Sequence, residues 1–179
     1  AAIEPGKHGW IDAEKPVAGP MDAILRPIAV APCSSDTHAM HGGSGGLHNM
    51  ILGHEAVGVV VEVGSLVKNF KPGDVCVVPC CTPDWEAVDL QRKGSNNAHD
   101  YGMMTSFKYL NTAPGVFAEF FICNNADANL VLKPEDVSVE DALMTVDMMS
   151  TGMYGAEMAN IQLGDTVVVL GVGPVGLMA

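Results

Sequence analysis

Residues 51–64, ILGHEAVGVVVEVG, set His54 and Glu55 between two glycines at the head of a valine-rich run. β-Branched residues bounded by glycine are typical of a strand. Similar short runs recur between glycine and proline turns, at residues 23–33 (AILRPIAVAPC), 74–81 (DVCVVPCC), 115–123 (GVFAEFFIC) and 129–134 (NLVLKP). The pattern predicts a β-rich domain over residues 1–137, with a long polar excursion over residues 82–112.

The pattern changes after residue 137. Ser138 is a plausible helix N-cap with Asp141 three positions later, and residues 139–161 have apolar residues at helical spacing. A turn at 162–165 and an apolar strand at 166–170 (TVVVL) are expected next. They lead to GVGPVG, in which Gly171, Gly173 and Gly176 match the glycine turn that receives a dinucleotide pyrophosphate. The expected fold class is therefore mixed α and β.

Composition excludes several kinds of partner. The 179 residues carry a formal net charge of -12, which would repel nucleic acid and anionic membrane surfaces. No apolar run reaches the length of a membrane helix, and no signal segment is apparent at the amino terminus. Five cysteines without regular spacing favour reduced thiols. We expect a cytoplasmic protein that binds neither nucleic acid nor membranes.

His54 has two plausible metal-binding companions elsewhere in the chain. Cys33 lies in the segment APCSSDTHAM, and Asp147 lies among apolar residues between two helical segments. A thiolate, an imidazole and a carboxylate suit a catalytic zinc site, which usually has three protein ligands and one open position. Alternatively, His54 is satisfied by the backbone at the end of a strand, Glu55 faces solvent and the glycines form an ordinary turn.

The motifs CSSDTH, GHEAVG, PDW, GVFAEFF, DMMSTG and LGVGPVGLMA, taken together, resemble the zinc-dependent medium-chain alcohol dehydrogenases. The resemblance extends over essentially the whole chain and is closest to their tetrameric, NADP-dependent secondary alcohol dehydrogenase branch. It implies a GroES-like catalytic domain over residues 1–137. It also implies that residues 138–179 form connecting helices and the first βα turn of a Rossmann NADP-binding domain.

The resemblance also implies roles for individual residues. Cys33, His54 and Asp147 match the ligands of one catalytic zinc, and Glu55 matches an occasional or exchanging ligand beside them. Asp36 matches an aspartate that hydrogen-bonds the ring of His54, although from the sequence alone a turn-capping role is as plausible. The hydroxyl of Ser35 and the ring of His38 match a proton relay. The implied reaction transfers a hydride between a secondary alcohol or ketone and NADP(H).

Two departures from the family pattern affect these expectations. Residues 82–113 contain no cysteine, so we expect no structural zinc. The positions of Cys80, Cys81 and Phe107 line the substrate pocket in the resembled enzymes, where small apolar residues and a tryptophan are more usual. The nucleotide-binding part is expected to be incomplete, so the 179 residues alone are expected to be inactive, whereas the full-length form is expected to be a homotetramer.

Two other functions remain open. A zinc-free, quinone-reductase-like enzyme of the same superfamily would have no use for Cys33, His54 and Asp147 together, and metal analysis would distinguish it. A non-catalytic fragment would act through the apolar surface that a nucleotide-binding sheet would otherwise cover. A cofactor titration would separate that fragment from a competent enzyme.

Overall fold

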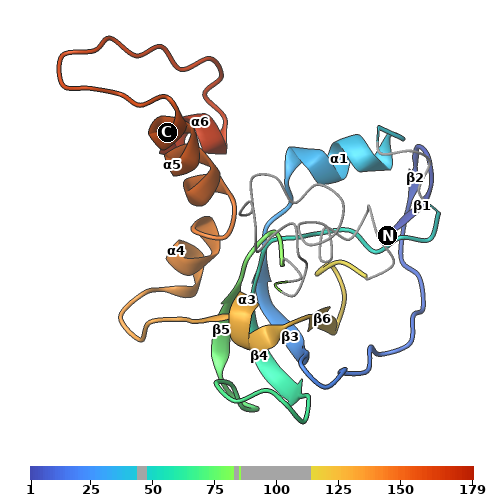
Figure 1. Cartoon of the computed structure of the whole chain (residues 1–179). Coiled ribbons are helices and arrows are strands. Elements are labelled where there is room, and N and C mark those ends of the chain that lie inside the picture. Colours follow the sequence, from blue (N-terminus) through green and yellow to red (C-terminus); the bar gives the residue numbers. More distant parts are fainter. Residues whose placement is uncertain (44–47, 83–84, 86–113) are drawn as a thin grey trace.

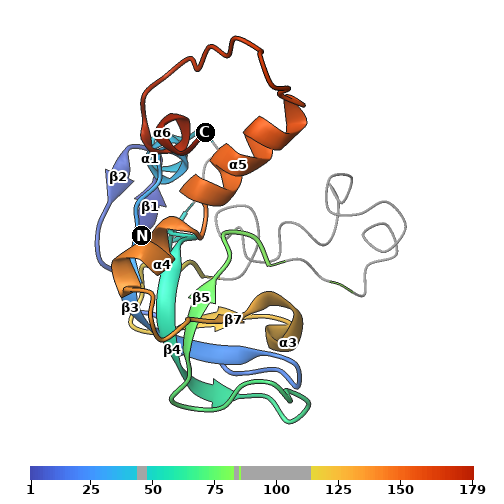
Figure 2. The same ribbon diagram turned by 90° about the vertical axis from the view of Figure 1, so that its left-hand side faces the viewer.

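The computed structural model describes residues 1–43, 48–82, 85 and 114–179, and the bulk of the polar segment at 82–112 lies outside these ranges, with Phe107. A five-stranded antiparallel sheet organises the first part of the chain, in the order β6–β3–β4–β5–β7. Figure 1 shows β3 to β6, and Figure 2 shows β7 beside β5. Its strands are β3 (Ala23–Val30), β4 (Ala56–Val63), β5 (Val75–Val78), β6 (Phe121–Cys123) and β7 (Val131–Leu132). A small hairpin, β1 (Ala2–Glu4) with β2 (Lys7–His8), precedes the sheet.

The pairing of β3 with β4 forms the centre of the sheet. Their register runs from Ala23 opposite Val63 to Val30 opposite Ala56, with irregularities beside Leu25 and after Pro27. Pro27 lacks an amide hydrogen, but β6 pairs with β3 only as far as Leu25. At Pro27, one edge of β3 has no hydrogen-bonded neighbour among the described strands. A residue without an amide hydrogen is therefore tolerated there.

The two faces of the sheet are buried against different elements. One face holds the main core, made of Ala23, Leu25, Ala56, Val60, Cys76, Val78, Val116, Phe121, Cys123, Ala126 and Leu130. On the other face, Val57 of β4 packs with Ala142, Leu143 and Val146 from α4 (Val139–Met144) and the residues after it. The second contact anchors the start of the helical region beside the beginning of β4 (Figure 2).

The helices begin largely where the sequence predicts. Ser138 is the N-cap of α4, and its hydroxyl accepts a hydrogen bond from the Asp141 amide at 3.0 Å. The helical stretch is split into α4 and α5 (Met148–Met158), with Asp147 as the N-cap of α5. Two further helices complete the first part, α1 (Ser34–Met40) and α3 (Ala126–Asn129). None of the described helices has the length and apolar character needed to cross a membrane.

The segment at 166–170 corrects one prediction, because no strand forms there. A strand requires a hydrogen-bonded neighbour, and no described strand pairs with these residues. Their apolar side chains are exposed, Leu170 at 94%. The helix expected after the glycine turn does form, as α6 (Pro174–Met178) with Gly173 as its N-cap, and Gly152 lets α6 approach α5 closely.

The predicted strands at 115–123 and 129–134 are present but shortened to β6 and β7. Residues 116–120 instead form a bent segment whose backbone pairs with residues 51–53, through Val116 to Gly53 and Phe117 to Leu52. This contact covers the turn that leads into His54.

Candidate metal centre

Four potential ligands converge from three separate parts of the fold. Cys33 is the N-cap of α1, His54 and Glu55 immediately precede β4, and Asp147 is the N-cap of α5. One ligand atom from each of these side chains lies within 4.8 Å of all the others. In a tetrahedral zinc site with bonds of about 2.0–2.3 Å, ligand atoms are roughly 3.3–3.8 Å apart, so the spacing needs only a small contraction.

The ring of His54 is 3% exposed and presents its two nitrogens to different carboxylates. Nε2 lies 3.4 Å from Oδ2 of Asp147 and 3.8 Å from Oε1 of Glu55, whereas Nδ1 lies 3.6 Å from Oδ1 of Asp36. A proton on Nδ1 would face Asp36 and leave the Nε2 lone pair directed toward the other ligands.

Glu55 is fully buried, with 0% of its surface exposed. Neither of its carboxylate oxygens has a hydrogen-bond partner within the described part of the chain. A buried carboxylate in that state is costly unless a cation or a proton neutralises it. The alternative of a solvent-facing Glu55 is therefore wrong, and the side chain faces the other candidate ligands.

The turn at Gly53 accounts for this orientation. Gly53 has φ +92°, a left-handed conformation that reverses the usual alternation of side chains and that glycine adopts without strain. A Cβ at this position would lie 2.6–2.8 Å from ring atoms of Phe117. Only a residue without a side chain fits, so the glycine lets consecutive residues both reach the site.

Asp36 is buried and joins two backbone segments of the site. Its Oδ2 accepts a hydrogen bond from the Cys33 amide at 3.0 Å, and its Oδ1 accepts one from the Gly53 amide at 2.9 Å. These bonds fix the backbone beside two candidate ligands, Cys33 and His54. Asp36 therefore connects these two backbone segments through hydrogen bonds, in addition to lying near the imidazole of His54.

A hydrogen bond from a residue of α5 orients the side chain of Asp147. The Thr151 hydroxyl, one turn later in α5, donates a hydrogen bond of 2.6 Å to Oδ1, while Oδ2 faces His54. Thr151 is not among the site residues predicted from the sequence. Its signal was the i, i+4 spacing from Asp147, which places two polar side chains on one face at the start of a helix.

The charges of the cluster shift the acid–base properties of its members. Burial opposes the charged imidazolium, but Asp147 and Asp36 outweigh it and raise the pKa of His54 to about 10. Burial, reinforced by the charge of Asp147, raises the pKa of Glu55 to about 7. The hydrogen bond from His54 lowers the pKa of Asp147. A proton on His54 would partly neutralise the carboxylates of Asp36, Glu55 and Asp147 around it.

The residues predicted for the proton relay and for the nucleotide turn lie outside the cluster of four candidate ligands. Ser35 is half-buried in α1, and its hydroxyl has no hydrogen-bond partner among the described residues. His38 is exposed one turn later, and no hydrogen bond between the two is present in the described structure. Gly171 has φ +100°, and a Cβ on Gly176 would collide with the carbonyl oxygen of Gly171, so this turn requires glycine at both positions.

Cys80 and Cys81 follow the end of β5 and are both half-buried free thiols. A hydrogen bond from Cys80 lowers the pKa of the Cys81 thiol, and the same bond, followed by burial, raises the pKa of Cys80. Asp147 acts electrostatically on both thiols. The pair therefore lies close to the candidate ligands.

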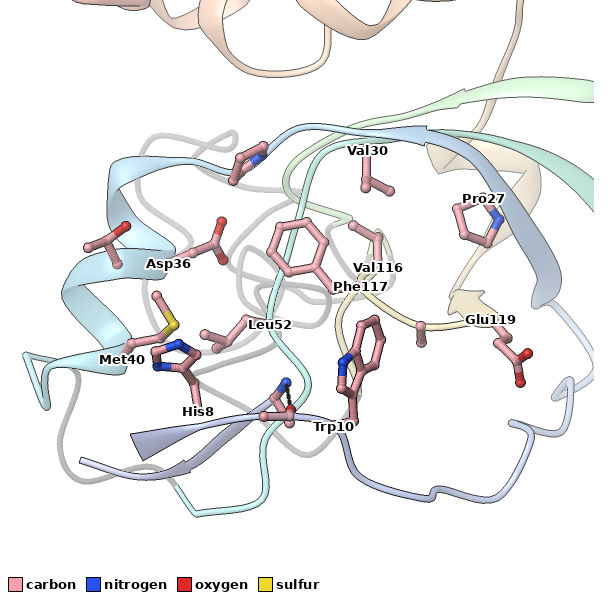
Figure 3. A pocket seen from close by; sticks show the side chains of 15 residues that line it. His8, Trp10, Pro27, Val30, Asp36, Met40, Leu52, Val116, Phe117 and Glu119 are labelled. Carbon is pink, nitrogen blue, oxygen red and sulfur yellow. Dashed lines mark hydrogen bonds between the residues drawn. The ribbon is translucent and has the colours of Figure 1, made fainter. Parts of the chain in front are cut away.

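A separate cavity of about 720 Å³ lies between the N-terminal residues, β3, α1 and residues 116–119 (Figure 3). Its wall is mainly apolar, with Trp10, Met40, Leu52 and Phe117 among the side chains in view, and Asp36 reaches it from α1. None of the four candidate ligands lines this cavity. The metal cluster is thus distinct from the cavity.

Comparison with known proteins defines the class. Residues 19–135 match the alcohol dehydrogenase GroES-like domain family, and the chain belongs to this family. It is similar to solved zinc-dependent alcohol dehydrogenases, with a TM-score of 0.85 to one from Streptococcus pneumonia at 31% identity, over 98% of this chain and 49% of that one. An alcohol dehydrogenase from a Thermus species gives the same score and identity, over 98% of this chain and 51% of the other.

Two curated relatives have a higher sequence identity to the chain than these solved structures. The chain is 57% identical to the NADP-dependent isopropanol dehydrogenase of Thermoanaerobacter brockii, over 100% of this chain and 51% of that protein. It is 54% identical to the enzyme of the same name from Entamoeba histolytica, over 97% of this chain and 47% of that protein. The chain therefore spans about half the length of these relatives, and the expected GroES-like fold is confirmed.

Proposed function

We propose that Cys33, His54 and Asp147 bind one zinc ion, with Glu55 as an additional or exchanging ligand. The observation that carries the proposal is the burial of Glu55 beside His54 and Asp147, with no hydrogen bond to its carboxylate among the described residues. A dication would neutralise the concentrated negative charge. The donor set of sulfur, imidazole nitrogen and carboxylate oxygen suits zinc.

We further propose that the full-length protein transfers a hydride between a secondary alcohol, or its ketone, and NADP(H). Support comes from the ligand set and from similarity to two enzymes named NADP-dependent isopropanol dehydrogenases. When bound, zinc would supply Lewis acidity that makes an alcohol hydroxyl easier to deprotonate.

The chain's own residues would prepare that reaction. The carboxylate of Asp36 holds the backbone at Cys33 and Gly53, and the Thr151 hydroxyl holds Asp147. In this proposal, the buried Ser35 hydroxyl receives the substrate proton and passes it toward His38 at the surface. Cys80, Cys81 and Phe107 would line the substrate space, and Gly171, Gly173 and Gly176 would receive the NADP pyrophosphate.

Further parts of the proposal concern the whole protein. We propose that the whole protein is a cytoplasmic homotetramer. We also propose that it has no structural zinc, because residues 82–113 contain no cysteine. For the 179 residues alone we expect no turnover, because one glycine turn supplies no walls for the adenine and nicotinamide rings. The division near residue 137 remains our interpretation of the change from sheet to helices.

Metal analysis of the purified chain tests the centre directly. We expect one zinc per chain, lost in Cys33→Ser and Asp147→Asn variants that keep the wild-type circular dichroism spectrum. A Glu55→Gln variant should keep most of its zinc, and in the full-length enzyme it should lower the rate of NADP-dependent 2-propanol oxidation more than it lowers zinc content. A folded chain without zinc affinity would favour the zinc-free, quinone-reductase-like alternative.

A further inference from the structure

Two consecutive thiols lie next to the candidate metal centre without belonging to it. In the antiparallel pairing of β5 with β4, Val78 lies opposite Ala56, so the chain after Val78 runs beside the residues that precede Ala56. Those residues are His54 and Glu55. Cys80 also packs against the cluster that contains Val146, the neighbour of Asp147. The pair thus lies between two of the segments that provide candidate ligands.

The two thiols are consecutive in the chain, so their Cα atoms are only about 3.8 Å apart. Successive side chains of a regular strand point to opposite faces, but β5 ends at Val78 and Pro79 intervenes before Cys80. Both side chains are half-buried and neither is in a disulfide, so two adjacent free thiols share a partly accessible position.

The other cysteines do not form such a pair. Cys76 and Cys123 are fully buried in the main core, on β5 and β6, which are separated in the sheet by β3 and β4. Cys33 belongs to the metal cluster. Cys80 and Cys81 are therefore the two cysteines among the five that are placed to bind one ligand together.

The chemistry of adjacent thiols limits what the pair can do. Consecutive Cα atoms are about 3.8 Å apart, shorter than the roughly 4.4–6.8 Å that an unstrained disulfide spans, so oxidation to a disulfide is disfavoured. Zinc needs three or four protein ligands, and two sulfurs alone are too few. A trivalent arsenical that carries one organic group needs only two sulfurs.

We propose that Cys80 and Cys81 form a dithiol site that binds trivalent arsenicals, separate from the proposed zinc ligands. With phenylarsine oxide, two S–H bonds break, two As–S bonds form, and the arsenical oxygen leaves with both protons as water. Arsenic remains trivalent, so no oxidant or reductant is required. Once one sulfur has reacted, the neighbouring thiol attacks intramolecularly and the adduct is held at both ends.

The test is intact-protein mass spectrometry of the zinc-treated chain after addition of phenylarsine oxide. We expect one phenylarsenic group per chain, with two hydrogens lost. The Cys80→Ser and Cys81→Ser variants should each lose the adduct, whereas Cys123→Ser and Cys33→Ser should retain it. Circular dichroism verifies the fold of each variant, and zinc content is measured separately, so failure of the zinc proposal would not affect this result.

Removal of the arsenical by competing thiols shows whether the arsenic is bound by two sulfurs or by one. Ethanedithiol should remove the arsenical, whereas glutathione at the same thiol concentration should leave it bound. Removal by glutathione, an adduct that persists in both Cys80→Ser and Cys81→Ser, or loss of the adduct in Cys33→Ser would each overturn the proposal.

Discussion

Replacing Gly53 with alanine should destabilise the metal-free chain through two separable effects. The residue has φ +92°, and a left-handed conformation costs a residue with a side chain about 1–2 kcal/mol. The new methyl group would also lie 2.6–2.8 Å from the Phe117 ring, and overpacking of this kind typically costs about 1–3 kcal/mol. We expect a total loss of about 2–5 kcal/mol, a large share of the stability of an ordinary domain.

A second glycine of the same chain provides a matched control. Gly73 has φ +98°, but a Cβ there would meet no atom within 4 Å. Gly73→Ala should therefore show only the backbone cost of about 1–2 kcal/mol. The difference between the two variants measures the collision with Phe117.

Urea unfolding of the metal-free chain, followed by circular dichroism, provides the measurement. Adding Phe117→Leu to Gly53→Ala should restore part of the lost stability, because a smaller side chain leaves room for the methyl group. Equal losses in Gly53→Ala and Gly73→Ala, or no recovery in the double variant, would refute the close packing at this turn.

Four further predictions concern the metal centre. Zinc binding near pH 7 should release the proton of His54, whose pKa is raised to about 10, so calorimetry in buffers of different ionisation enthalpy should detect proton release. In the metal-free chain the same group stabilises the fold fully below about pH 6.5, and this contribution should be lost as the pH rises toward about 10. Asp36→Ala should weaken zinc affinity roughly 10–100-fold, and an unchanged affinity would reduce Asp36 to a turn residue. Thr151→Val should weaken zinc binding by about 1 kcal/mol, whereas Ser150→Ala, which loses hydrogen bonds only to backbone carbonyls, should not.

Local patterns determined much of what the sequence predicts correctly. The valine-rich run after Glu55 predicts β4, Ser138 predicts the start of α4, and the glycines at 171–176 predict a turn followed by a helix. Each depends on interactions between residues close in the chain, such as capping bonds and the conformational freedom of glycine. The strand predicted at 166–170 was wrong because strand formation depends on a partner elsewhere in the structure.

The types of side chain at the site were also readable from the sequence, since a thiol, an imidazole and carboxylates indicate zinc chemistry. Their meeting depends on tertiary structure. Asp147 reaches His54 because Leu143 of α4 and Val146, just after that helix, pack on Val57, a contact between distant segments. Glu55 turns inward because Gly53 adopts a left-handed conformation under the Phe117 ring. Local propensity does not encode such contacts, because they form only when the buried apolar surfaces of separate elements come together.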